Sequence, residues 1–192
     1  MGIALPQLAP ASEDRVSGAQ VIDGSLKFDS GSSNYLSRTP GSAGNRKTWT
    51  WSGWIKRDII SAYQHPLIGG SNGTGHGVIV RFSPASAGTD TLQIGEYVSG
   101  WNWQLITSKV FRDTGWYHIV IAVDTTQTSS SDRVKFYING TLETSFGTSS
   151  YPSLNYDTLF NTNPLQVLGG RTWNGSIDGY YSGRLSNVYL ID

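Results

Sequence analysis

The chain has no cysteine, a single methionine and few charged residues, which make up 15% of its 192 positions. Without cysteine it forms neither disulfides nor thiolate metal sites, so burial and backbone hydrogen bonds must hold the fold together. It also lacks a run of the roughly 20 apolar residues that a membrane-spanning helix needs. Residues 1–11 lack the basic region and the long apolar run of a signal peptide. We therefore expect a protein that is made in a cytoplasm and has no membrane partner.

An excess of charge of either sign is absent as well. The 14 basic residues balance the 14 acidic ones, so the formal net charge is zero. Proteins that bind nucleic acid usually carry a basic surface that neutralises phosphates. The balance of charge predicts that nucleic acid is not a partner.

Glycine and aromatic residues are abundant instead, with 23 Gly, 10 Tyr and 7 Trp. Aromatic residues suit half-buried strands, and glycine supplies the turns between them. The apolar runs have the spacing of strands in an antiparallel sandwich. We predict an all-β jelly roll of two antiparallel sheets, without helices. Its strands are expected at residues 20–28, 35–37, 49–57, 65–69, 77–82, 91–97, 103–108, 116–124, 132–138, 141–146, 165–168 and 184–191.

Two stretches add local detail to this prediction. In residues 49–57, Trp49, Trp51 and Ile55 share one face of the strand, and polar residues dominate the other. Asn139 and Gly140 separate two strand candidates, and this pair favours the type I′ turn of a β-hairpin, because both of its central residues need a positive φ.

The first 18 residues differ from the rest of the chain. They hold Pro6, Pro10 and a charged cluster at Glu13–Arg15, but no periodic apolar pattern. We predict an extended N-terminal arm over residues 1–18 and one domain over residues 19–192.

Several short motifs follow one another in an order that is known from one superfamily. They are Leu26–Leu36, Trp49–Lys56, Trp116–Asp124, Tyr137–Gly140, Leu168–Gly170 and Tyr181–Asp192. In this order the chain resembles the laminin G-like modules of the concanavalin A-like lectin/glucanase superfamily. The resemblance implies the jelly roll that the strand pattern predicts.

A narrower resemblance concerns residues 38–54, RTPGSAGNRKTWTWSGW. This stretch is similar to domains of structural proteins from marine tailed bacteriophages. The resemblance implies a non-enzymatic virion protein, either a capsid-decoration protein or a tail or head fibre module. It also implies a homo-oligomer whose N-terminal arm contacts other virion proteins, with host-surface glycans as candidate ligands. The alternative is a stand-alone carbohydrate-binding lectin domain.

Glucanases of this sandwich type place paired carboxylates at alternating positions of one strand, so that both flank the scissile bond. The three glutamates here are Glu13, Glu96 and Glu143, and none has a second acid two or four positions away. We therefore expect no enzymatic activity, although pairs of aspartates from distant strands stay open.

Calcium is a candidate cofactor, because Asp and Asn oxygens are its preferred ligands. Asp29, Asn34 and Asp178 are the candidate ligands. No dense acidic cluster surrounds them, and roles in stabilising turns explain these residues equally well.

Aromatic residues beside amides form the candidate glycan site, since sugar rings stack on aromatic faces and amides bond their hydroxyls. The candidate residues are Trp101, Asn102, Trp103, Gln104, Trp173, Asn174 and Tyr180. Packing of these rings at the ends of the sandwich, or against a neighbouring subunit, is the alternative, because seven tryptophans exceed the needs of one small site.

Overall fold

The computed structural model describes residues 22–60, 65–70, 77–82, 90–173 and 175–192. Their strands are β1 (Leu26–Phe28), β2 (Leu36–Arg38), β3 (Thr48–Arg57), β4 (His65–Gly70), β5 (Val78–Phe82), β6 (Thr91–Tyr97), β7 (Trp101–Val110), β8 (Trp116–Asp124), β9 (Val134–Ile138), β10 (Thr141–Glu143), β11 (Phe146–Ser150), β12 (Gln166–Leu168), β13 (Arg171–Trp173), β14 (Ser176–Asp178) and β15 (Gly183–Ile191). Two short 3₁₀ turns, η2 (Ser30–Ser32) and η3 (Ser130–Asp132), interrupt them. Within these ranges, no helix is long and apolar enough to cross a membrane.

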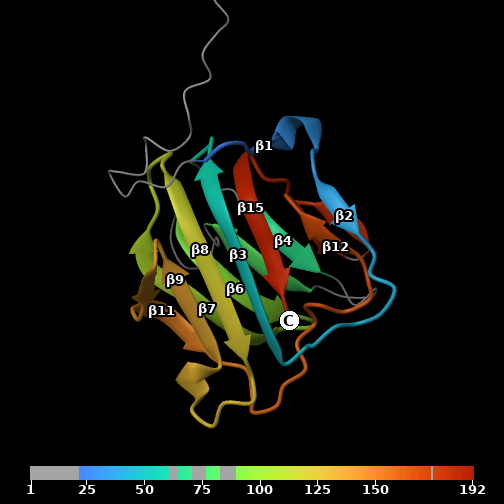
Figure 1. Ribbon diagram of the computed structural model, residues 1–192, viewed down its shortest axis with the longest axis vertical. Helices are drawn as coiled ribbons and strands as arrows, with labels where there is room; N and C mark the ends of the chain where they lie inside the picture. Colours follow the sequence, from blue (N-terminus) through green and yellow to red (C-terminus); the bar gives the residue numbers. More distant parts are fainter. Residues whose placement is uncertain (1–21, 61–64, 71–76, 83–89, 174) are drawn as a thin grey trace, which may run out of the picture.

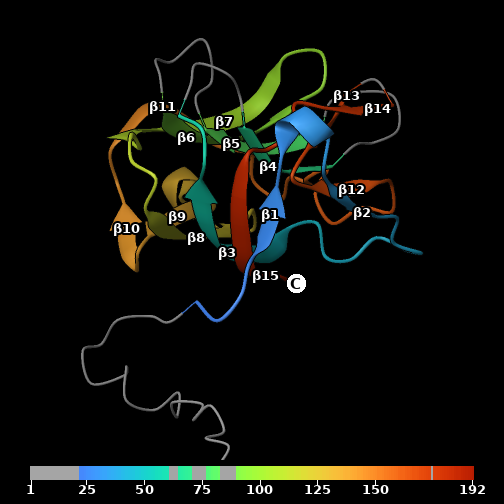
Figure 2. The same cartoon turned by 90° about the horizontal axis from the view of Figure 1, so that it is seen from above.

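The strands form two antiparallel sheets (Figure 1). A separate hairpin consists of β13 and β14. A six-stranded sheet has the order β1-β15-β3-β8-β9-β10, and a seven-stranded sheet has the order β11-β7-β6-β5-β4-β12-β2. Figure 2 shows the sheets as two layers, with the β13–β14 hairpin outside the seven-stranded sheet. The predicted all-β jelly roll of two sheets is confirmed.

The hydrophobic core lies between the two layers. The six-stranded sheet contributes Trp51, Ile55, Ile121 and Phe136, and the seven-stranded sheet contributes Phe82, Ile94, Trp103 and Leu105, all at most 1% exposed. Along β3, buried and half-buried residues alternate as predicted, with Trp49, Trp51 and Ile55 turned inward. The alternation leaves every second side chain of β3 on the outer face of its sheet.

The strand bounds at residues 91–97 and 116–124 are confirmed by β6 and β8. The hairpin prediction is confirmed as well, since Asn139 has φ 50° and Gly140 has φ 79°. Asn139 also ties the turn to β8, because its Oδ1 accepts a hydrogen bond of 2.8 Å from the backbone N–H of His118.

Two parts of the strand prediction are wrong. Residues 141–146 are not one strand: β10 ends at Glu143 in the six-stranded sheet, and β11 starts at Phe146 in the seven-stranded sheet. The chain changes layers between them, where Glu143 Oε1 accepts a hydrogen bond of 2.8 Å from Ser145 N. The β13–β14 hairpin was not predicted. The predicted N-terminal arm lies outside the described residues.

Candidate functional site

Three polar side chains form a hydrogen-bonded network on the outer face of the seven-stranded sheet. Arg81 Nε donates a hydrogen bond of 2.7 Å to Gln93 Oε1, and Gln93 Nε2 donates one of 2.9 Å to Gln104 Oε1. They lie on the adjacent strands β5, β6 and β7, where Arg81 is directly opposite Gln93. Arg81 and Gln93 are 7% and 1% exposed. The contacts fix the orientation of both amides and of the guanidinium before any ligand arrives.

The charge on Arg81 persists in this buried position. Burial, and next the positive charge of Arg171, lower the pKa of the Arg81 guanidinium to about 10. The group therefore stays protonated at neutral pH and supplies a fixed cation.

Aromatic rings continue this network along the sheet. The Trp101 ring lies against Gly95 of β6, where a Cβ atom would come within 2.8 Å of the ring. Only glycine allows this approach of the indole to the sheet. The Arg81 guanidinium carbon lies 5.6 Å from the centre of the Trp101 ring. Tyr97 meets Trp101 edge-on at 5.3 Å and stacks on Trp173 at 5.9 Å.

The β13–β14 hairpin carries Trp173 to this face. Its turn includes Gly175, which has φ 79°. Across the hairpin, Arg171 Nε forms an ion pair of 2.7 Å with Asp178 Oδ1, and the Arg171 guanidinium carbon lies 4.7 Å from the centre of the Trp173 ring. A second contact of 3.2 Å from Arg171 to Asp178 Oδ2 makes the pair bidentate.

We call this set the aromatic face. It consists of Arg81, Gln93, Tyr97, Trp101, Gln104, Arg171 and Trp173. The three rings are half-buried, so each keeps part of its surface accessible. The half-exposed rings can stack on an apolar surface, and the half-buried Gln104 and Arg171 can bond hydroxyl or carboxylate oxygens. The buried Gln93 and Arg81 hold Gln104 and Trp101 in place from behind.

Of the seven residues predicted for a glycan site, Trp101, Gln104 and Trp173 come together here. Trp103 lies in the core with 0% exposure, because it points inward from β7. Asn102 faces away from Trp101 and donates a hydrogen bond of 2.9 Å to Tyr156 Oη. Trp103 and Asn102 are therefore not part of the aromatic face.

Tyr180 and Asn174 complete the predicted set. The Tyr180 hydroxyl donates a hydrogen bond of 2.9 Å to Ile177 O, and its ring stacks on Tyr35 at 6.1 Å. These contacts hold the segment that follows β14. Asn174 lies outside the described residues.

Comparison with known proteins gives a family for this chain. A family model described as the concanavalin A-like lectin/glucanases superfamily matches residues 29–192. The chain belongs to this superfamily. The match extends no further than the superfamily, so the narrower resemblance to phage structural proteins stays a prediction. No curated protein matches the chain.

Solved structures show the same fold at low sequence identity. A heptameric SAP-like pentraxin of Limulus polyphemus is 17% identical with a TM-score of 0.57, and the match covers 81% of this chain and 68% of the pentraxin chain. Domains LG4-5 of the mouse laminin α1 chain are 12% identical with a TM-score of 0.58, covering 88% of this chain and 41% of that one. Domain 4 of the arabinanase AbnA from Geobacillus stearothermophilus, solved in complex with arabinotriose, is 19% identical with a TM-score of 0.52, covering 76% and 61%. The chain thus spans less than two thirds of the laminin and arabinanase chains.

The candidate calcium ligands of this superfamily member have partners within the chain. Asp29 caps η2, where its Oδ1 accepts a hydrogen bond of 2.9 Å from Gly31 N, and a bond from Ser32 lowers the pKa of its carboxyl. Asn34 Oδ1 accepts a bond of 3.3 Å from Asp29 N. Asp178 is held by Arg171. Among the described residues, no group of three or more His, Asp or Glu side chains could hold a metal ion. Calcium binding stays a prediction.

Sequence analysis missed Arg81, Gln93, Tyr97 and Arg171. A weak signal was present in Gly95, because glycine inside a strand of apolar and polar alternation often marks the close approach of another group. The four missed residues themselves look like ordinary strand positions, and their contacts exist only once the strands are paired.

Proposed function

We propose that this chain is a carbohydrate-binding module and that the aromatic face is its sugar site. The observation that carries the proposal is the row of rings Trp101, Tyr97 and Trp173, bordered by Arg81 and Arg171. A pyranose or furanose has one apolar face, which suits an indole, and a rim of hydroxyl groups, which suits oriented amides and guanidinium groups.

Fixed polar groups support this assignment further. The amides of Gln93 and Gln104 hold each other in place, so sugar binding would cost little side-chain entropy. The similar arabinanase domain, solved with a bound arabinotriose, supports a sugar ligand for this fold.

We also propose that the module is not an enzyme. Glu96 is fully buried, accepts a hydrogen bond from the Tyr156 hydroxyl and accepts one of 2.8 Å from Leu159 N. It thus secures the segment after β11 against the seven-stranded sheet. Glu143 lies in the other sheet, on β10. These two glutamates therefore do not form the strand-borne pair of a sandwich glucanase.

We further propose that the module belongs to a virion, because residues 38–54 resemble domains of phage structural proteins. A sugar site on an outer face would suit a capsid or fibre module that meets host-surface glycans. A stand-alone lectin domain would use the same face. One experiment therefore tests sugar binding for both roles.

That experiment is a glycan array, followed by calorimetric titration of the best ligand, each with and without EDTA. Trp101→Ala and Trp173→Ala should weaken binding at least about tenfold, because each removes a stacking platform. Trp54→Ala is the matched control, since Trp54 is a half-buried tryptophan on the outer face of the six-stranded sheet. Silence across the array, or an equal loss in Trp54→Ala, would overturn the proposal. Loss of binding in EDTA would indicate that sugar binding depends on calcium.

A further inference from the structure

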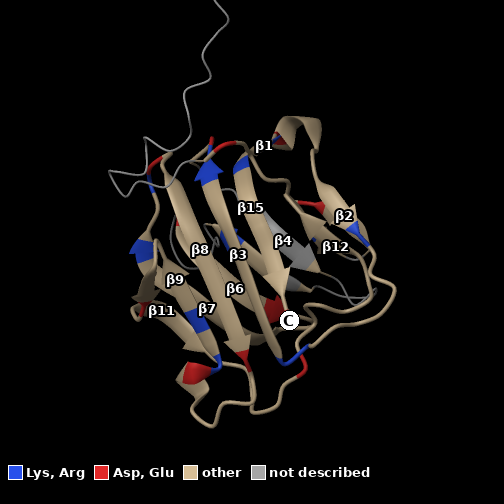
Figure 3. Cartoon of the chain, viewed as in Figure 1, with Lys and Arg blue, Asp and Glu red and all other residues tan. Residues whose placement is uncertain are grey.

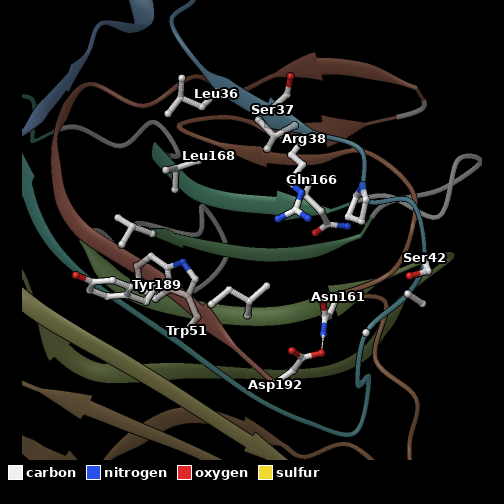
Figure 4. A pocket seen from close by; sticks show the side chains of 16 residues that line it. Leu36, Ser37, Arg38, Ser42, Trp51, Asn161, Gln166, Leu168, Tyr189 and Asp192 are labelled. Carbon is white, nitrogen blue, oxygen red and sulfur yellow. Dashed lines mark hydrogen bonds between the residues drawn. The ribbon is translucent and has the colours of Figure 1, made fainter.

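A crevice of about 520 Å³ opens between the two sheets, away from the aromatic face. One wall comes from the edge strand β2 and its neighbour β12, and the other from β3 and β15. Its lining includes Leu36, Arg38, Gln166, Trp51, Val188 and Leu190 (Figure 4), and none of its lining residues belongs to the aromatic face. A volume of this size suits a small organic ligand.

Two buried polar atoms in the lining lack hydrogen-bond partners within the described part of the chain. They are the indole N–H of Trp51, a residue that is 1% exposed, and Oε1 of Gln166. Neighbouring Trp49 shows the usual arrangement, because its indole N–H donates a bond of 3.0 Å to Thr158 Oγ1. A buried polar group without a partner costs free energy, and the side chains that carry this donor and this acceptor both line one crevice, which favours a ligand that satisfies them.

Arg38 adds a cation at the same end of the crevice as Gln166. The two residues are directly opposite each other on β2 and β12, and Figure 4 shows the guanidinium beside the amide. No ion pair joins Arg38 to a carboxylate among the residues that the structure describes. The carboxylate of Asp192 also lines the crevice, but its Oδ2 accepts bonds from Asn45 N and Asn161 Nδ2.

Part of the lining is aliphatic. Leu36, Leu168, Val188 and Leu190 supply branched hydrocarbon groups, and Leu36 and Leu190 are 50% and 41% exposed at the opening. This surface differs from the flat rings of the aromatic face and suits a hydrocarbon chain better than a sugar.

From these observations we propose a second ligand site in this crevice, for a small organic acid with an aliphatic body. The acid group pairs with the guanidinium of Arg38, and the hydrocarbon chain packs on the aliphatic wall. An oxygen of the ligand accepts the indole N–H of Trp51, and a hydroxyl, where the acid carries one, donates to Gln166 Oε1. The proposal is independent of the sugar site.

The test is an NMR titration of the ¹⁵N-labelled full chain with octanoate, observed at the tryptophan indole N–H signals. The Trp51 signal, assigned as the one missing in Trp51→Phe, should shift and saturate. Trp103 provides the internal control, because its indole N–H is also buried without a partner among the described residues but does not line the crevice. Its signal should not move.

The matched variants are Arg38→Gln in the crevice and Arg112→Gln outside it, both at exposed arginines. Arg38→Gln should weaken octanoate binding about tenfold or more and leave binding of uncharged 1-octanol unchanged, because only the acid uses the guanidinium. Arg112→Gln should change neither. The proposal fails if octanoate causes no saturable shift of the Trp51 signal. It also fails if Arg38→Gln and Arg112→Gln behave alike, or if glucose shifts this signal and octanoate does not.

Discussion

The outer faces of the two sheets carry similar aromatic side chains in different surroundings. On the six-stranded sheet, Trp54 packs against His118 at 5.0 Å, and Trp116 and Tyr137 are half-buried nearby. Figure 3 shows this face, where the charged residues of β3, β8 and β15 lie near the strand ends. The aromatic face of the seven-stranded sheet instead places Arg81 and two amides among its rings.

The difference shows that aromatic content alone does not define a sugar site. Rings on either sheet can offer an apolar platform, but hydroxyl groups also need donors and acceptors in fixed positions. On the outer face of the seven-stranded sheet, the contacts from Arg81 through Gln93 to Gln104 fix such groups beside the rings. The difference between the two outer faces therefore depends on that network, and variants that remove one of its members should abolish the difference.

The largest effect is expected from Gln93→Leu, which keeps the side-chain volume and removes the acceptor of the Arg81 Nε–H. The buried guanidinium then loses this partner, so the free energy of unfolding should fall by about 1–3 kcal/mol. Sugar affinity should fall with it, because Gln104 and Arg81 lose their fixed orientation. Urea unfolding and calorimetric titration measure the two effects.

Thr50→Val is the matched change on the six-stranded sheet, at a half-buried polar position of β3. Its unfolding free energy should stay within about 0.5 kcal/mol of the unmodified chain. Equal stability of Gln93→Leu and Thr50→Val would mean that the network does not distinguish the two faces.

A smaller effect is expected from Arg171→Gln, which removes the cation beside the Trp173 ring. A cation–π contact at a partly exposed site contributes about 0.5–2 kcal/mol, so sugar affinity should fall several-fold. Arg184→Gln is the control, because Arg184 forms a comparable ion pair of 2.6 Å with Asp58 on the six-stranded sheet. A loss of affinity in Arg184→Gln as large as that in Arg171→Gln would contradict the assignment of the site to one sheet.

Much of the fold could be predicted because alternation and turn residues are local signals. The strands at residues 91–97 and 116–124 and the turn at Asn139–Gly140 follow from side chains that are neighbours in sequence. Membership of a sheet is different. Residues 141–146 form one continuous run in sequence, and only the packing of the two layers decides that the chain leaves one sheet at Glu143 and joins the other at Phe146.

The site could be predicted only in part, for a related reason. Trp101 and Trp103 are two positions apart and would share a face on a regular strand. A register shift opposite Tyr97 pairs Trp101 with Tyr97 and Trp103 with Glu96, so the two indoles point to opposite sides of β7. Such a bulge leaves no mark in the sequence. The contact of Arg81 with Gln93 likewise exists only after β5 and β6 pair.

The smallest expected effect is a loss of stability at alkaline pH. It involves two tyrosines, one on the six-stranded sheet and one beside the seven-stranded sheet. On β8 of the six-stranded sheet, burial and next a hydrogen bond to Asp113 raise the pKa of Tyr117 from 10.0 to about 12. Beside the seven-stranded sheet, burial and next the bond to Glu96 raise the pKa of Tyr156 to about 12. Both hydroxyls keep their protons longer in the folded state than in the unfolded state. Their stabilisation is therefore complete below pH 10 and is lost as the pH rises from 10 to 12.

The melting temperature should accordingly fall between pH 9 and pH 11, and Tyr117→Phe and Tyr156→Phe should each reduce the size of that fall. Tyr189→Phe is the control, because Tyr189 is 57% exposed. Tyr156→Phe also removes the bond to Glu96, so it should lower the melting temperature at every pH, whereas its effect on the difference between the two pH values isolates the titration. If the fall persists undiminished in the Tyr117→Phe, Tyr156→Phe double variant, other groups cause it. If only one single variant reduces it, the alkaline response comes from that tyrosine alone.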